Sequence, residues 1–144
     1  MIRKLTWSTL AVGLLLAGAC QNANNKNEEA ETLAKKAIEI HDEIMPQISA
    51  FDKHDILVDS LLNNLPALKS KDATLDTAAA REEFQALKGD LESATDKMMI
   101  WMKEYTMDST DVAYQQAEID RISALKTEFE QVEYEAQRLL APFK

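Results

Sequence analysis

The chain has 144 residues, a formal net charge of −9 and a single cysteine. This length is enough for one domain with a proper hydrophobic core. The negative charge disfavours binding to nucleic acid or to anionic lipid headgroups through a basic surface. One cysteine cannot form an internal disulfide, and it excludes CxxC redox and metal sites.

The N-terminal segment has the composition of a secretory signal. Two basic residues precede residues 5–19, an uncharged and largely apolar stretch that ends in small residues before Cys20. The stretch is too short for a comfortable membrane span. We therefore expect residues 1–19 to be a signal peptide. The 125 residues that follow carry 14 basic and 25 acidic side chains, which is a net charge of −11.

The three residues before Cys20 are Ala17, Gly18 and Ala19. Together with the cysteine they resemble the lipobox of bacterial lipoproteins. The resemblance implies that the Cys20 thiol is acylated and that Cys20 becomes the first residue of the mature chain. The match departs from the commonest pattern, because Ala17 stands where a branched aliphatic residue is usual. The alternatives are an uncleaved anchor or an ordinary secretory signal with an incidental cysteine.

The rest of the chain has the composition of an all-α protein. Residues 20–28 are polar and asparagine-rich, and we expect them to hold the lipidated cysteine and a flexible tether. Beyond the leader there is a single glycine, Gly89, and no Asn-Gly or Asp-Gly hairpin turn. We therefore expect residues 29–144 to form a helical bundle domain.

Apolar residues at steps of three and four predict three long helices. The first begins near Glu28 and is expected to end at Pro66, because proline disfavours helical geometry in the residue before it. The second begins near Leu75. The third follows the polar break at residues 108–111, which is rich in N-cap residues. The predicted stripes are Leu33, Ala37, Ile40, Ile44, Phe51, Val58, Leu61, Leu65 and Leu68; Ala80, Phe84, Leu87, Leu91, Ala94, Met98, Trp101 and Tyr105; and Ile119, Ile122, Leu125, Phe129, Val132, Ala136 and Leu139.

Short connections between these helices favour antiparallel neighbours. The predicted fold is an up-down-up three-helix bundle with long antiparallel helices. The alternative is a four-helix bundle in which helix one is broken at Pro46. Gly89 either weakens the second helix or allows a neighbour to approach closely.

One local cluster has the residue types for chemistry. Residues 41–46 read His-Asp-Glu-Ile-Met-Pro, and folding the first hairpin brings His41 level with several methionines of the second helix. Thioethers with imidazole suit Cu(I), and a Met–His pair can ligate haem. Methionine is also a common filler of helical cores, and core packing is the favoured interpretation. The alternatives are a copper or haem site at His41, Met45, Met98 and Met102, and a partner patch at Trp101 and Met99. His54 is interpreted as a core histidine.

The sequence offers no catalytic residues. Two histidines cannot supply the ligands of a metal-dependent phosphohydrolase, and there is no glycine-rich loop for phosphate. The acylatable cysteine, the residues 41–46 motif and Trp101, Met102 and Tyr105 are similar to small helical lipoproteins of Bacteroidetes-type bacteria. That resemblance implies a bacterial cell-envelope location, with the outer membrane favoured over the inner. We expect a non-enzymatic protein with a binding or structural role, whose partner is another envelope protein.

Overall fold

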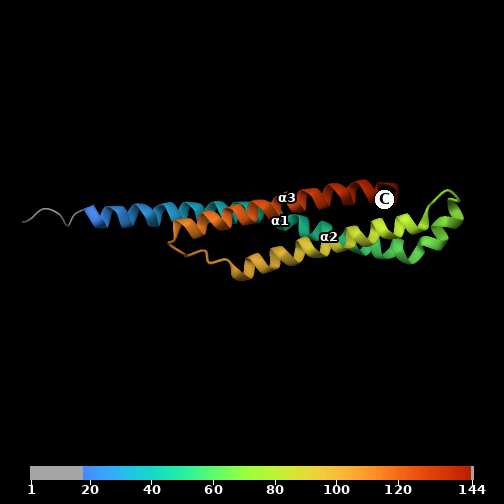
Figure 1. Cartoon of the computed structure of the whole chain (residues 1–144), viewed down its shortest axis with the longest axis horizontal. Helices are drawn as coiled ribbons and strands as arrows, with labels where there is room; N and C mark the ends of the chain where they lie inside the picture. Colours follow the sequence, from blue (N-terminus) through green and yellow to red (C-terminus); the bar gives the residue numbers. More distant parts are fainter. Residues whose placement is uncertain (1–17, 144) are drawn as a thin grey trace, which may run out of the picture.

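The computed structural model describes the backbone of residues 18–143 and the side chains of residues 25–143. It contains α1 (Gly18–Lys71), α2 (Thr77–Glu104) and α3 (Val112–Leu140), followed by the 3-10 turn η1 (Ala141–Phe143). The helices lie side by side in alternating directions along one axis (Figure 1). The prediction of an all-α, up-down-up three-helix bundle is confirmed. Residues 1–17 of the predicted signal peptide lie outside the described residues. The backbone of Gly18, Ala19 and Cys20 is described, but their side chains are not.

One continuous hydrophobic core runs along the inside of the bundle. All its members except Leu140 come from the three predicted apolar stripes, because residues three and four apart share one face of a helix. Leu139, which was predicted in place of Leu140, is only partly buried. Near the middle, the rings of Phe51 in α1 and Phe129 in α3 stack with their centroids 4.8 Å apart. The central cluster is Ala37, Ile44, Phe51, Val58, Leu61, Leu65, Phe84, Leu87, Leu91, Ala94, Met98, Trp101, Ile119, Ile122, Leu125, Phe129, Val132, Ala136 and Leu140.

Helix α1 is much longer than predicted. Its 54 residues begin at Gly18, so helical backbone covers all of residues 20–28, for which a flexible tether was expected. The N-terminal part of α1 extends past the turn between α2 and α3 (Figure 1). At the other end, the predicted stop at Pro66 is wrong, because α1 continues to Lys71.

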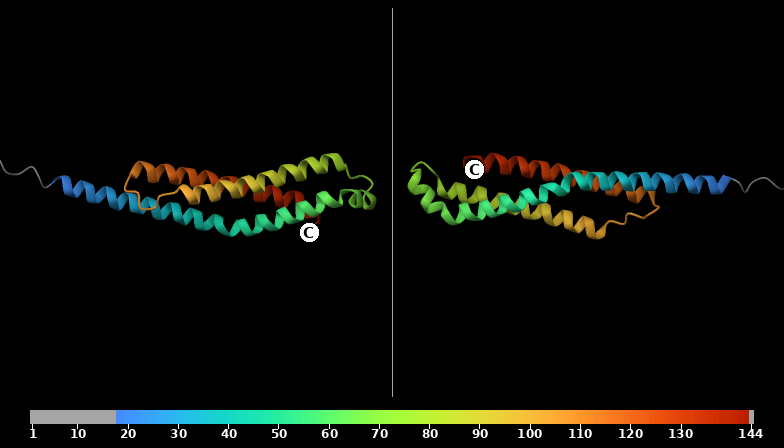
Figure 2. Two further views of the ribbon diagram at one scale, coloured as in Figure 1. Left: turned by 90° about the horizontal axis from the view of Figure 1, so that it is seen from below. Right: turned by 180° about the vertical axis from the view of Figure 1, so that it is seen from behind.

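Both internal prolines of α1 lie on its solvent-exposed side. Pro46 and Pro66 each remove one backbone hydrogen bond, but the adjacent turns bury Ile44 and Leu65 in the core. This burial holds the helix together through each proline, and α1 bends along its length (Figure 2). Because α1 is continuous at Pro46, the alternative four-helix bundle is wrong.

Aspartates begin the two later helices. The Asp76 carboxylate accepts hydrogen bonds from the backbone N–H groups of Ala78 and Ala79, both at 3.0 Å. These bonds hold the pKa of Asp76 below its usual range, because they stabilise the ionised form. Asp111 caps α3 in the same way, which confirms the predicted N-cap role of the polar break.

Ion pairs between helices agree with this antiparallel arrangement. Lys88 lies 3.0 Å from Asp55 and 3.1 Å from Asp59, and hydrogen bonds to these carboxylates raise its pKa. Each exposed ion pair adds little to the free energy of unfolding. Its two side chains can meet in only one register of the two helices, so each pair is consistent with the register observed here. Other ion pairs between helices are Lys97–Glu128, Arg121–Glu104 and Lys126–Glu43, and His54 contacts the Glu133 carboxylate.

Gly89 lies on the exposed side of α2, and nothing stands within 4 Å of a Cβ built on it. The glycine therefore weakens the helix without allowing a close approach. We expect Gly89→Ala to raise the free energy of unfolding by about 1 kcal/mol, since alanine has the better helix propensity. Urea unfolding followed by circular dichroism measures this, with Ala86→Gly on the same exposed side as the reverse control. A Gly89→Ala protein less stable than the wild type would contradict the placement of Gly89 at an open, exposed helical position.

Candidate functional site

His41 meets Trp101 across the α1–α2 interface, as the predicted hairpin register requires. The two rings stack with centroids 5.8 Å apart, and His41 Nδ1 lies 2.9 Å from the Asp42 carboxylate. The side chain of His41 is 18 % exposed, whereas Trp101 is only 1 % exposed. Trp101 is therefore part of the core and cannot present its ring to a partner, which corrects the predicted partner patch in that respect.

The methionines near His41 differ in their surroundings. Met98 is completely buried, and Met45 is half-buried against the core. Met102 and Met99 are 36 % and 46 % exposed. The structure thus gives Met98 and Met45 a packing role and places Met99 and Met102 at the surface. A Cu(I) or haem site at His41, Met45, Met98 and Met102 stays a prediction.

His54 is a half-buried histidine with a partner. Its Nε2 lies 3.2 Å from the nearer carboxylate oxygen of Glu133 in α3. This contact joins α1 to α3 and satisfies one of the two ring nitrogens. The interpretation of His54 as a histidine of the bundle interior, with no ligand role, agrees with this placement.

A polar cluster that the sequence analysis missed closes the end of the bundle at the α2–α3 turn. The side chain of Gln115 is completely buried in α3. Its amide nitrogen donates to backbone carbonyls of the turn, those of Thr106, Met107 and Ser109, at 3.0–3.3 Å. Its amide oxygen accepts a 2.8 Å hydrogen bond from the hydroxyl of Tyr105. Gln115 therefore ties the turn to both helices.

Aromatic rings continue from Trp101 into this polar cluster. Tyr105 stacks on Trp101 at 4.5 Å and on Tyr114 at 6.5 Å. Burial raises the pKa of the Tyr105 hydroxyl, and the neighbouring Tyr114 and Glu118 add to the shift. The hydroxyl is therefore held in its neutral, hydrogen-bonding form.

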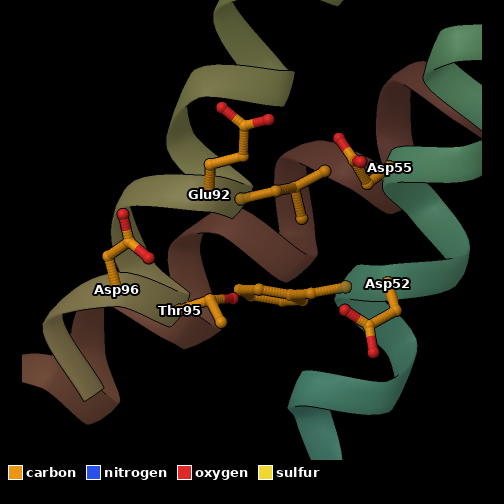
Figure 3. Close-up of a pocket in the computed structure, with 7 residues that line it drawn as sticks. Asp52, Asp55, Glu92, Thr95 and Asp96 are labelled. Carbon is orange, nitrogen blue, oxygen red and sulfur yellow. The ribbon is translucent and has the colours of Figure 1, made fainter. Parts of the chain in front are cut away.

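An acidic recess of about 280 Å³ lies between α1 and α2. Asp52 and Asp55 of α1 face Glu92, Thr95 and Asp96 of α2 across it (Figure 3). Phe51 and Leu91 complete its lining. Among residues 25–143, the structure places no three His, Cys, Asp or Glu side chains so that they could hold a metal ion together. The recess therefore presents negative charge to solvent without forming a cation cage.

An apolar recess of about 520 Å³ lies where α1 passes the α2–α3 turn. Ala34, Ile38 and Met107 give it an apolar lining, and Met107 is 60 % exposed. Its charged rim consists of Glu31, Lys35, Glu39 and Asp108. In the part of the chain that the structure describes, no helix is long and apolar enough to span a membrane.

The fold and these two recesses define an acidic three-helix bundle with surface features suited to binding. Comparisons with models of protein families, with curated proteins and with solved structures give no match for this chain.

Proposed function

We propose that this protein is a non-enzymatic lipoprotein of the bacterial cell envelope, anchored through acylated Cys20, which acts by binding a partner or by structural support. The observation that carries the proposal is the position of the only cysteine. Cys20 directly follows an uncharged apolar segment and a run of small residues, where lipidation would use it. The resemblance to small helical lipoproteins of Bacteroidetes-type bacteria agrees with this location and favours the outer membrane.

The shape of the bundle supports such a role. Helix α1 begins at Gly18, so the backbone of Cys20 belongs to the helix that runs the length of the bundle. A helix of 54 residues is about 80 Å long at 1.5 Å per residue. An anchor at its N-terminal end would put the α2–α3 turn nearer the membrane and the α1–α2 turn farther away.

The charge of the protein gives a reason for a lipid anchor. A net charge of −11 after residue 19 gives no electrostatic attraction to anionic headgroups, so acyl chains must supply the membrane affinity. The recesses described above are lined by carboxylates, one lysine that pairs with Glu31, a threonine and apolar groups, without a histidine or thiol that could act as base or nucleophile. A binding or structural role is therefore the better proposal.

Metabolic labelling with an alkyne analogue of palmitate tests the anchor. We expect the full chain, produced in a bacterial host, to be labelled and to fractionate with membranes. Cys20→Ala is expected to lose the label completely, because no other cysteine exists to carry it. Ser49→Ala, at an exposed position of α1, is the control and should be labelled like the wild type. Unchanged labelling or membrane fractionation of Cys20→Ala would refute the proposal.

A further inference from the structure

One side of the bundle, formed by α1 and α2, combines exposed methionines with acidic groups in a regular order. Positions seven apart lie on one side of a helix. On α1 this relation joins Ile38, Met45 and Asp52; on α2 it joins Glu92 to Met99. The α1–α2 face is defined here as Ala34, Ile38, Met45, Asp52, Glu92, Asp96, Met99, Met102 and Met107.

The middle of the α1–α2 face is apolar and partly open to solvent. Met99 and Met102 are neighbours one turn apart on α2, and both are more than one third exposed. Met107, which is 60 % exposed, lies farther along the α1–α2 face and lines the apolar recess with Ala34 and Ile38. Exposed apolar groups on an otherwise charged bundle mark a binding surface. Methionine side chains are flexible and adapt to different apolar partners.

Negative charge lies at one end of this apolar surface, in the acidic recess. Lys88 pairs with Asp55 and Glu92, at 3.0 and 3.4 Å. Asp52 and Asp96 are exposed, and neither makes an ion pair with another residue in the described part of the chain. Two carboxylates at this end are therefore available to a cationic partner.

The opposite end of the apolar surface is also acidic. Glu31, Glu39 and Asp108 stand on the rim of the apolar recess with a single basic residue, Lys35. Lys35 already pairs with Glu31 at 2.8 Å. A ligand that fits the whole face must therefore have an apolar middle and positive charge at both ends.

We propose that the α1–α2 face binds an amphipathic, cationic α-helix of another protein. The face runs from the level of Ala34 to that of Asp52, 18 residues of α1 or about 27 Å, which matches a helix of about five turns. The apolar side of the partner lies on Met99, Met102 and Met107, and its Lys or Arg residues meet the acidic ends. A second copy of this chain fits poorly, because it would bring carboxylates against carboxylates. The proposal rests on the proposed binding role and names the class of partner.

The test uses the full chain in nanodiscs of zwitterionic lipid and a fluorescent 18-residue helical peptide. The peptide carries leucines on one side and lysines at both ends. One control peptide has the same composition in scrambled order, and another has glutamate in place of lysine. Fluorescence anisotropy gives each Kd, with empty nanodiscs measured in parallel. We expect the amphipathic cationic peptide to bind at least about tenfold more tightly than either control.

Variants then locate the binding. The double variant Met99→Glu, Met102→Glu should weaken binding about tenfold, although it adds negative charge that by itself would attract the peptide. Asp52→Asn with Asp96→Asn should weaken binding less and reduce its dependence on salt. Tyr134→Glu on α3 and Asp90→Asn on another side of α2 are the matched controls, and both should bind like the wild type. Circular dichroism checks that each variant keeps its helices.

Three results would overturn the proposal. They are equal binding of the scrambled peptide, unchanged binding by the Met99→Glu, Met102→Glu variant, and a dimer of the unbound chain that this variant dissociates. Co-elution of the chain with the nanodiscs is scored separately. A chain that fails to associate with nanodiscs but still binds the peptide would count against the lipid anchor and not against the α1–α2 face.

Discussion

Phe129→Ala is expected to lower the free energy of unfolding by about 3–5 kcal/mol, the range for removing a fully buried phenylalanine side chain. Phe129 has no exposed surface, and its ring stacks on Phe51 at 4.8 Å in the middle of the bundle. The substitution removes apolar area from the core and leaves a cavity that rigid neighbouring helices cannot fill. Since a domain of this size is stable by only about 5–15 kcal/mol, the loss is a large fraction of the total.

Urea unfolding at constant m-value measures this loss. Phe51→Ala and the double variant complete a thermodynamic cycle. Because each single substitution already removes the stacking, the double variant should lose about 0.5–1.5 kcal/mol less than the sum of the two single losses. Ile56→Ala is the control, because Ile56 is 70 % exposed and its truncation should change stability by less than about 0.5 kcal/mol. Equal effects of Phe129→Ala and Ile56→Ala would show that the core is not packed as described.

Gln115→Leu is expected to destabilise the protein by about 2–3 kcal/mol, although leucine keeps most of the volume. The substitution removes the donor to three carbonyls of the α2–α3 turn and the acceptor of the Tyr105 hydroxyl. Each net hydrogen bond contributes about 0.5–1.5 kcal/mol, and the half-buried Tyr105 hydroxyl keeps only its longer contact with the Ala34 carbonyl, at 3.4 Å. The turn should also become more mobile, which amide hydrogen exchange at residues 106–109 detects.

Gln116→Leu is the matched control for this experiment. Gln116 is the next residue, is exposed, and bonds only to Asp120 at 2.9 Å. Its substitution should cost less than about 0.5 kcal/mol. Gln115→Glu separates hydrogen bonding from volume, because a carboxylate cannot donate to the carbonyls. If Gln115→Leu and Gln116→Leu proved equally stable, the buried glutamine would have no structural role.

Much of the architecture could be predicted from spacing alone. Apolar residues at steps of three and four indicated three helices, and the short polar segments between them indicated antiparallel packing. Counting residues from the first turn placed His41 level with Trp101 to within a turn, and their rings do stack. Local signals of this kind depend on the 3.6-residue period, which the sequence displays directly.

The stop predicted at Pro66 was wrong, because the effect of a proline depends on its surroundings. Proline disfavours helix locally, but Leu65 is buried and Leu68 packs against the core, while Pro66 faces solvent. The apolar contacts on the inner side offset the lost hydrogen bond on the outer side. The same balance operates at Pro46, where the sequence analysis did predict a continuous helix in its favoured fold.

The candidate site was predicted less well. Met98 and Met102 were grouped in one candidate metal site, yet Met98 is buried, as its place on the apolar stripe indicated, while Met102 is exposed. Gln115 was missed because glutamine is a residue type that usually lies at the surface. The one clue was its position, four residues before Ile119 on the apolar stripe.

The sequence by itself determined the helical class, the number of helices, their approximate register and the acidic charge, since these follow from composition and period. The tertiary structure alone decided how residues at the margins of each apolar stripe are covered. It buried Gln115 against the α2–α3 turn, left Met45 half-buried and left Met99 and Met102 exposed. The physical reason is that burial depends on the rotation of each helix toward two neighbours, and small shifts in that rotation exchange core residues for surface residues.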